Sequence, residues 1–314
     1  MNEEYKLPKV LIPAFTKVSI LNKNEPIENY AVQLNYFPQK DSKEKINFHE
    51  LDKQGKECLA NYKISDKQFY SRAKKHYENI KLLLKGENTR QIKLKSDWRL
   101  IVGLGNKSVY ETSITLHHIY GIPYIPASAI KGVVRSWIIT SVFNNKEEDA
   151  IQNKIFCDIF GCPEKVEKAK SYYKKSMEGK IIFFDAFPTS KPNIEPDIMN
   201  NHYQPYYDKK APPADYHSPI PISFLTVKDK ENERTNFQFI IGEKKSSEPV
   251  YKIDKSLILF KNEKGQTVSY FKEGMTREKI LNMNLIDLTF EWLKLALTEH
   301  GIGAKTAVGY GYME

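Results

Sequence analysis

Residues 120–142, YGIPYIPASAIKGVVRSWIITSV, join an extended segment directly to a helix. Pro123 and Pro126 keep the backbone extended, because the residue before a proline avoids the helical conformation. Ser128 is then predicted to cap a helix, since its side-chain oxygen can accept a hydrogen bond from a backbone N–H of the first turn. The apolar residues that follow have helical spacing and predict one buried stripe: Ile130, Val133, Val134, Trp137, Ile138 and Val142.

Outward from this helix, short apolar runs predict strands and a second helix. A run closed by glycine predicts a strand at 98–103, and KIIFFDAF predicts another at 180–187. Residues 220–227 and 237–241 alternate like the strands of a hairpin joined by a charged turn. A helix is predicted at 285–300, followed by a terminal strand. Four residues of that helix are expected to face inward: Leu288, Trp292, Leu295 and Ala296.

From residue 97 onward the predicted order is strand, helix, three strands, helix and terminal strand. With one extra hairpin strand allowed, this order resembles a βαββαβ plan, in which two helices cover an antiparallel sheet. We therefore expect an α+β fold, ferredoxin-like and similar to an RNA-recognition motif, with loop insertions at about 144–179 and 188–219. The first insertion is polar and lysine-rich and predicts a loop with a short helix. Seven prolines in the second predict a loop without long regular elements.

Residues 1–96 are predicted to form a basic accessory region, and residues 97–314 the ferredoxin-like domain. The first 96 residues hold 19 Lys and Arg against 12 Asp and Glu, so they contribute most of the chain's formal charge of +9. A basic balance suits a polyanionic partner, although lysine enrichment on a solvated surface gives the same count. Within this region we expect an extended segment at 9–21 and a helix at 65–86 with a lysine-bearing face.

Composition excludes several classes of protein. No run of about 18 apolar residues occurs, and the first residues lack the apolar core of a secretory signal, so we expect neither a transmembrane helix nor secretion. Three cysteines cannot form an even disulfide framework, which favours a reduced, cytoplasmic protein.

Residues 301–311, GIGAKTAVGYG, are the most informative candidate for binding. Four glycines directly after a helix let the backbone approach a ligand and present its N–H groups, and Gly301 suits the left-handed position that ends a helix. Lys305 and Thr306 add a cation and a hydroxyl, which together suit a phosphate backbone. A nucleotide-binding P-loop is excluded, because that motif precedes a helix. A tight structural turn into an edge strand explains the glycines equally well.

Lys131 and Arg135 form the second candidate, one turn apart on the polar side of the first helix. Two cations at this spacing repel each other unless an anion lies between them. A helix N-terminus nearby also favours phosphate. A solvated helix face is the alternative explanation.

Several colinear motifs resemble the RAMP superfamily, the repeat-associated proteins of CRISPR systems. IPASAIKGVVR at 125–135 is similar to its IPGSSLKGALR segment, and 301–311 to its C-terminal glycine-rich loop. Between them, 159–161 (IFG) and 179–186 (GKIIFFDA) match its middle segments in the same order. Ala127 and Asn201 depart from the glycine and proline common at those positions. Further stretches narrow the resemblance to the family of the sixth subunit of the type III-B Cmr effector complex: 109–112, 116–123, 197–203 and 212–215.

This resemblance, which covers about 97–314, implies a ferredoxin-like, non-catalytic RNA-binding subunit without a cofactor or metal. Such a subunit caps the complex near the 3′ end of the guide (CRISPR) RNA and supports target-RNA binding in antiviral defence. Its implied protein partners are the backbone RAMP subunit, to which target cleavage belongs, the small helical subunit and the other terminal RAMP subunit. The implied guide-RNA contacts are Ser128, Lys131, Arg135, Gly301, Gly303, Lys305, Thr306, Gly309 and Gly311.

A metal-independent ribonuclease that processes guide RNA is the alternative function. His117 and His118 would act as general acid and base, together with Lys131 or Lys305. We favour a non-catalytic interpretation, because adjacent residues of a strand point to opposite faces. One histidine would then pack on the sheet, and the other would contact RNA or a partner.

Local chemistry suggests three further candidate sites. Asp185 lies in an apolar run, which favours a hydrogen-bonded structural carboxylate over a metal ligand or base. The spacing of Cys157 and Cys162 gives a weak zinc signal, even with His202 or His217 added. Four tyrosines in the second insertion suit either base stacking or packing of the loop: Tyr203, Tyr206, Tyr207 and Tyr216.

Overall fold

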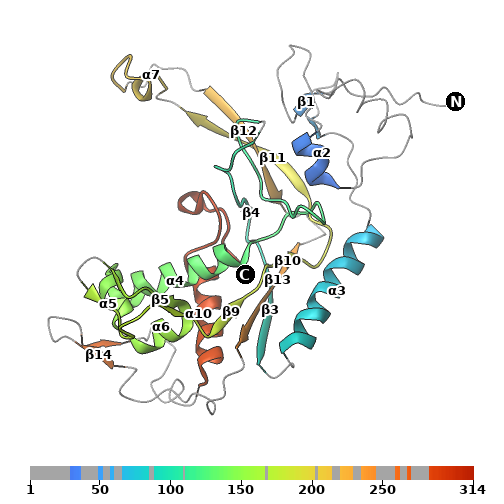
Figure 1. The fold of residues 1–314 in the computed structure, drawn as a ribbon. Coiled ribbons are helices and arrows are strands. Elements are labelled where there is room, and N and C mark those ends of the chain that lie inside the picture. The colour runs from blue at the N-terminus through green and yellow to red at the C-terminus, as the bar shows by residue number, and fades with distance from the viewer. Residues whose placement is uncertain are drawn as a thin grey trace. The chain divides into compact units, whose positions relative to one another are not determined.

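The computed structural model describes residues 29–36, 49–51, 57–59, 66–84, 88–108, 110–166, 169–201, 204–213, 220–228, 235–244, 259–261, 267–269 and 283–314. The expected extended segment at 9–21 lies outside these residues. Two compact units are distinguished, each shown in Figure 1. Unit 1 takes its described residues from Met1–Arg72, Arg99–Tyr124 and Ser190–Thr235, and unit 2 from Ala73–Trp98, Ile125–Thr189 and Asn236–Glu314.

Unit 2 is built on an antiparallel sheet whose central strand is β13 (Asn236–Glu243). On one edge β13 pairs with β3 (Thr89–Lys95). On its other edge it pairs with β9 (Ile181–Phe183) and β10 (Phe187–Pro188), which follow each other along the strand. The predicted strand at 180–187 is therefore present, but it is interrupted between β9 and β10.

The C-terminal residues add to the free edge of β3. Met313 forms an isolated antiparallel bridge with Ser96, and Lys95 and Glu314 exchange two backbone hydrogen bonds of 2.9 Å. The spatial order is thus the C-terminal residues, β3, β13 and then β9 with β10. The predicted terminal strand is reduced to this bridge. The strand predicted at 98–103 is confirmed only at Arg99–Leu100, which form β4 in unit 1. The edge strand of the unit 2 sheet is Thr89–Lys95 instead.

Two helices pack against this sheet, α4 (Ala127–Phe143) and α10 (Leu285–Glu299) (Figure 1). All six residues of the predicted stripe on α4 are buried. On α10, Leu288, Trp292 and Ala296 are buried as predicted, whereas Leu295 is half-buried. Each large apolar side chain buried in this way stabilises the fold by about 1.5–3 kcal/mol. The α+β class is therefore confirmed.

The helix predicted at 65–86 is α3 (Asp66–Leu84), and its part in unit 2, from Ala73 onward, packs on the opposite side of the sheet (Figure 1). Its Tyr77 and Ile80 are buried, and Lys74, Lys75 and Lys81 of the predicted lysine-bearing face are exposed. The Tyr77 hydroxyl bridges the backbone of Phe187 in β10, donating to its oxygen and accepting from its N–H, both at 2.9 Å. A Cβ atom at Gly242 of β13 would lie 2.4 Å from Leu84 Cδ1, so α3 packs tightly here.

The first insertion of unit 2 is more regular than the predicted loop with one short helix. A buried carboxylate organises it: Asp158 accepts hydrogen bonds from Lys154 Nζ at 2.9 Å and Tyr173 OH at 2.6 Å, and Lys180 Nζ lies 3.2 Å away. The elements are α5 (Glu147–Ile151), α6 (Lys154–Phe160), β5 (Gly161–Cys162) paired with β8 (Met177–Glu178), and β6 (Lys165–Val166) paired with β7 (Ala169–Lys170). A separate hairpin joins β14 (Leu259–Lys261) to β15 (Thr267–Ser269).

Unit 1 contains a three-stranded sheet in the order β11 (Ile194–Asn201), β12 (Ile220–Lys228), β4. The hairpin predicted from 220–227 and 237–241 is wrong, because β12 and β13 lie in different sheets. The loop predicted at 188–219 is also wrong, since it contains β11. Pro196 is tolerated there because β11 is an edge strand. The remaining elements are α2 (Tyr30–Tyr36), β1 (His49–Leu51) paired with β2 (Glu57–Leu59), and α7 (Gln204–Tyr207).

The division of the chain at residue 97 stays a prediction. β3 begins eight residues before that boundary and pairs along β13, so the sheet itself starts earlier. Among the described helices, none is both long and apolar enough to cross a membrane.

Candidate nucleic-acid interface

The glycine-rich loop is closed at its base by backbone contacts. Helix α10 ends at Glu299, and Gly301 follows with φ +72°, the left-handed conformation predicted for it. The N–H of Ile302 donates to the carbonyl oxygen of Gly311 at 2.8 Å, so the two ends of the loop meet. Gly311 has φ +74°, and a Cβ atom there would lie 1.9 Å from the Ile302 carbonyl oxygen. Only glycine permits this closure.

The tip of the loop presents main chain to solvent. It contains a single 3₁₀ turn, η1 (Thr306–Val308), between Lys305 at φ +63° and Gly309 at φ +94°. The N–H groups of Val308 and Gly309 close this turn on the carbonyl oxygens of Lys305 and Thr306. Gly303 and residues 307–309 are exposed, and the side chains of Lys305 and Thr306 are half-buried. Exposed main chain beside a cation is chemically suited to an oxyanion.

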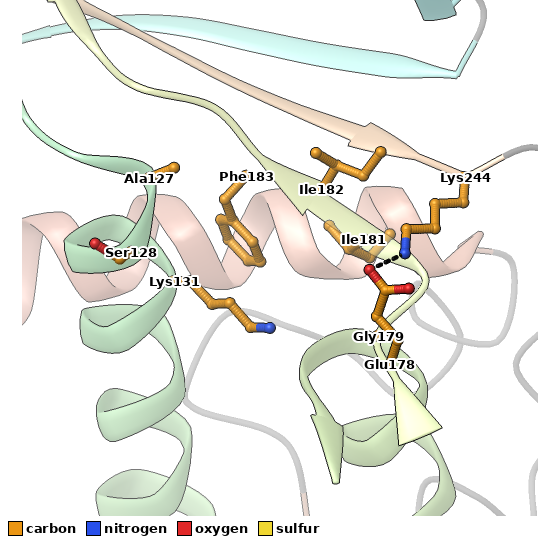
Figure 2. A pocket seen from close by; sticks show the side chains of 9 residues that line it. All are labelled: Ala127, Ser128, Lys131, Glu178, Gly179, Ile181, Ile182, Phe183 and Lys244. Carbon is orange, nitrogen blue, oxygen red and sulfur yellow. Dashed lines mark ion pairs between the residues drawn. The ribbon is translucent and has the colours of Figure 1, made fainter. Parts of the chain in front are cut away.

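The first turn of α4 borders a second cationic site, a cavity of about 210 Å³ shown in Figure 2. Lys131 extends from α4 toward Glu178, which forms an ion pair with Lys244. Burial lowers the pKa of Lys131, with further lowering from Arg135 and Lys244 and an opposing effect of Glu178. The lining residues are Ala127, Ser128, Lys131, Glu178, Gly179, Ile181, Ile182, Phe183 and Lys244.

Lys244 is a member of this site that sequence reasoning missed. It follows β13 directly, and its backbone N–H donates to the carbonyl oxygen of Lys180 at 2.9 Å. Hydrogen bonding and charge attraction from Lys244 lower the pKa of the exposed Glu178 carboxyl. No motif around Lys244 marks it, because its place in the cavity depends on the pairing of β13 with β9.

Arg135 does not share the cavity with Lys131 as the spacing suggested. Its guanidinium pairs with Glu147 of α5 at 2.5 Å and lies over the ring of Phe156, 5.3 Å from the centroid. The charge of Arg135 is thus balanced inside the protein. The Arg135 side chain turns toward the first insertion, although its charge still lowers the pKa of Lys131.

The capping role predicted for Ser128 is wrong. The helix begins at Ala127 with Pro126 as its N-cap, so Ser128 lies within the first turn. Asp185, between β9 and β10, supplies the missing acceptor: its Oδ1 accepts from the N–H of Ala127 at 2.7 Å. Backbone hydrogen bonds of 2.9 Å in both directions between Ile125 and Ala186 hold this contact in place. Asp185 is therefore the structural carboxylate that its apolar surroundings predicted.

His117 and His118 lie in unit 1, whereas the other nine predicted contacts lie in unit 2. The argument that their side chains point to opposite faces is wrong, because they lie at a turn. The N–H of Gly121 donates to the His117 carbonyl oxygen at 2.7 Å, and the two imidazole rings stack at 5.0 Å between centroids. His117 also stacks on Tyr120 at 4.4 Å, and its Nδ1 accepts from the Tyr120 N–H at 3.3 Å. These contacts make His117 part of an ordered turn.

The zinc hypothesis gains no support from the part of the chain that the structure describes. Cys157 and Cys162 are both buried, and burial raises the pKa of the Cys157 thiol. Its Sγ donates to the Ile151 carbonyl oxygen at 3.0 Å. No group of three or more His, Cys, Asp and Glu residues suited to a metal occurs among the described residues. His202 and His217 lie outside them, as do Tyr203 and Tyr216, while Tyr206 and Tyr207 are exposed.

Comparison with known proteins identifies relatives over most of the chain. Residues 91–314 match the model of the RAMP superfamily. The chain is 33% identical over 288 residues to the CRISPR system Cmr subunit Cmr6 of Pyrococcus furiosus. This match covers 77% of this chain and 72% of that protein. The CRISPR system CMR subunit Cmr6 of Saccharolobus solfataricus is 30% identical over 177 residues, 54% of this chain and 52% of that protein. A chain of the type III-B Cmr-beta complex bound to cognate target RNA, solved by cryo-EM, is 20% identical with a TM-score of 0.49, covering 78% of this chain and 65% of its own.

Proposed function

Because the chain belongs to the RAMP superfamily and, within it, to the Cmr6 family, we propose that it is the non-catalytic RNA-binding subunit of a cytoplasmic type III-B CRISPR effector complex. In this role it caps the complex near the 3′ end of the guide RNA and supports the binding of target RNA. Its protein neighbours are the backbone RAMP subunit, the small helical subunit and the other terminal RAMP subunit.

The observation that carries this proposal is the geometry of the glycine-rich loop. Its base is fixed by the hydrogen bond between Ile302 and Gly311, and its tip exposes main chain beside Lys305. A loop that is held in shape before binding loses little conformational freedom when a phosphate arrives, which favours binding. The sheet is a less suitable surface, because α3 covers the side that α4 and α10 leave open.

The same unit is proposed to be the ferredoxin-like domain of the family. Along the chain its elements run β3, α4, β9 with β10, β13, α10 and the C-terminal residues. In space the C-terminal residues lie beside β3, β3 beside β13, and β13 beside β9 with β10. This order supports a βαββαβ plan in which the C-terminal bridge stands for the last strand.

The proposed guide-RNA contacts fall into two groups within unit 2. The glycine-rich loop contributes Gly301, Gly303, Lys305, Thr306, Gly309 and Gly311. The α4 cavity contributes Ser128 and Lys131, and we add Lys244 because it lines the same cavity. Arg135 takes part only if RNA competes with Glu147 for its guanidinium. His117 and His118 belong to the proposal as separate contacts from unit 1.

Titration of the full chain with single-stranded guide RNA over a range of salt concentrations tests this function. Removal of one phosphate contact lowers the slope of log affinity against log salt by about 0.7. We expect Lys305→Ala to lose this much slope and to bind about tenfold more weakly, the effect of about 1.4 kcal/mol from one charged hydrogen bond. Lys174→Ala is the matched control, since Lys174 is an exposed lysine of unit 2 outside both groups.

Equal salt slopes for Lys305→Ala, Lys174→Ala and the unchanged chain would exclude the loop as the RNA-binding element. The same preparations also test the absence of catalysis. Incubation with guide-RNA precursor in EDTA should leave the RNA intact. Specific cleavage that disappears in His117→Ala or His118→Ala would instead establish the ribonuclease.

A further inference from the structure

Trp98 exposes 46% of its surface, while the other two tryptophans of the chain, Trp137 and Trp292, expose 5% and 0%. Single exposed apolar residues are common on folded proteins and need no explanation. Trp98 differs because it lies against the glycine-rich loop, where Val308 is also 61% exposed. A large aromatic face is thus presented to solvent at the tip of the proposed RNA-binding loop.

The backbone around Trp98 holds it in this place. The bridge between Ser96 and Met313 is followed by a hydrogen bond of 2.9 Å from the N–H of Asp97 to the carbonyl oxygen of Tyr312. These contacts bring the Trp98 ring within 4.8 Å of the Tyr310 ring, centroid to centroid, at an interplanar angle of 55°. The backbone contacts of residues 96 and 97 therefore place Trp98 beside the end of the glycine-rich loop.

The loop runs beside Trp98 at Gly309. A Cβ atom at Gly309 would lie 4.0 Å from Trp98 Cε3, which is ordinary van der Waals contact with the indole. Tyr310 is only 5% exposed, and its ring packs against the exposed ring of Trp98. Lys305 Nζ lies 5.9 Å from the centroid of that same Tyr310 ring. An aromatic face, a cation and exposed main chain therefore meet within one small surface.

This combination matches the chemistry of a single-stranded nucleotide. Aromatic side chains accept the faces of unpaired bases, and a cation nearby accepts the phosphate that follows the base. An apolar segment of a protein would use Trp98 but would gain nothing from Lys305. The charge beside the aromatic face thus favours RNA as the occupant.

We propose that Trp98 is a stacking residue, on which an unpaired base rests while its phosphate is held by the glycine-rich loop. This inference rests on the proposed RNA-binding function. Because all bases have an aromatic face, the contact favours unpaired nucleotides with little preference among them. It assigns a role to a residue outside the motifs that mark the loop.

The test uses the full chain, a short oligouridine and an abasic ribose-phosphate oligomer of equal length. Trp98 is the exposed one of three tryptophans, so its fluorescence reports directly on stacking. We expect the oligouridine to quench the exposed emission, and the abasic oligomer to bind without quenching. Trp98→Ala should weaken oligouridine binding by about 5- to 150-fold, the range for loss of one stacked base, and leave the salt slope unchanged.

Two control variants distinguish the loss of a stacking side chain from general disruption of the fold. Trp98→Phe retains a stacking face and should keep most of the affinity while removing the quenched emission. Tyr172→Ala removes an aromatic side chain of similar exposure, 48%, elsewhere in unit 2, and should leave the affinity unchanged.

Unchanged affinity of Trp98→Ala for oligouridine would overturn the stacking role. If Lys305→Ala still flattened the salt slope in that case, phosphate binding by the loop would stand alone. Failure of both oligomers to bind would remove the RNA-binding function itself. Loss of Trp98→Ala from the assembled complex at unchanged RNA affinity would assign Trp98 to a protein interface and contradict the proposal.

Discussion

Replacement of Gly311 by alanine tests whether the base of the glycine-rich loop is fixed by close backbone contact. An alanine at φ +74° adopts the left-handed conformation, which costs about 1–2 kcal/mol. Its Cβ atom would also lie 1.9 Å from the Ile302 carbonyl oxygen, so the backbone must move. That movement breaks the hydrogen bond from Ile302 to Gly311, which contributes about 0.5–1.5 kcal/mol. We expect Gly311→Ala to lower the free energy of unfolding by about 1.5–3.5 kcal/mol, the sum of these two costs.

Urea denaturation of the full chain measures this effect, provided that the denaturant dependence m is unchanged. Gly309→Ala is the matched comparison within the loop. Gly309 has φ +94° but has only Trp98 at 4.0 Å, so its substitution should cost the conformational strain alone, about 1–2 kcal/mol. Gly132→Ala lies inside α4 with open space around the Cβ position and should stabilise the chain by up to about 1 kcal/mol.

The order of the three variants decides the outcome. If Gly311→Ala is no more destabilising than Gly309→Ala, the loop base is not held by the contact with Ile302, and the argument for a preformed phosphate site fails. A loss of RNA affinity in Gly311→Ala at nearly unchanged stability would also contradict the reasoning, because it would separate the binding geometry from the backbone closure.

Two further predictions concern charge and pH in unit 2. Asp158→Asn leaves Lys154 and Lys180 without their buried anion, and we expect a loss of about 3–5 kcal/mol in the free energy of unfolding, measured in urea; an unchanged midpoint would contradict this. Burial lowers the pKa of His76 below 6.5, and the charge of Asp185 opposes this shift. As the pH falls below 6.5, His76 is therefore protonated more readily in the unfolded chain than in the folded chain. Stability should therefore fall on the acid side of pH 6.5, and His76→Phe should lack that part of the loss in denaturation measured at each pH.

The core helices were predictable because their signal is local. On α4, six apolar residues at helical spacing fall on one face, and all six are buried. On α10 the same reasoning misplaces only Leu295, which is half-buried while its neighbours Leu293 and Leu297 are buried. Such a helix can be predicted from local sequence, because the spacing of its apolar residues identifies the face that is buried in the core.

The strands were less predictable because edges and long-range pairing hide their signal. The sequence of β3 is TRQIKLK, in which Ile92 and Leu94 alternate with exposed polar residues. The residues after Trp98 are more continuously apolar, so the sequence predicts the strand there. Strand β11 contains Pro196, which an edge strand tolerates and a local argument rejects. Strands β12 and β13 lie in different sheets because each pairs with strands that are distant in sequence.

The start of α4 shows why a correct helix can have a wrongly assigned cap. Ser128 satisfies the local pattern, but the chain enters the helix one residue earlier, and the acceptor comes from Asp185, which lies between strands β9 and β10. Local spacing identifies residues whose side chains could accept a hydrogen bond at the start of a helix. Which side chain accepts it at the start of α4 is decided by the bridge between residues 125 and 186, which brings Asp185 close.

The spacing of Lys131 and Arg135 predicts a shared anion, and the tertiary structure gives the two cations different surroundings. Glu147 reaches the Arg135 guanidinium at 2.5 Å, so this charge is already balanced. Lys131 instead shares a cavity with Lys244, whose ammonium group pairs with the exposed carboxylate of Glu178. Because burial and the neighbouring cations lower the pKa of Lys131, a bound phosphate would relieve a repulsion that the fold maintains. We therefore expect RNA to engage α4 through Lys131, a distinction that spacing along the helix cannot make.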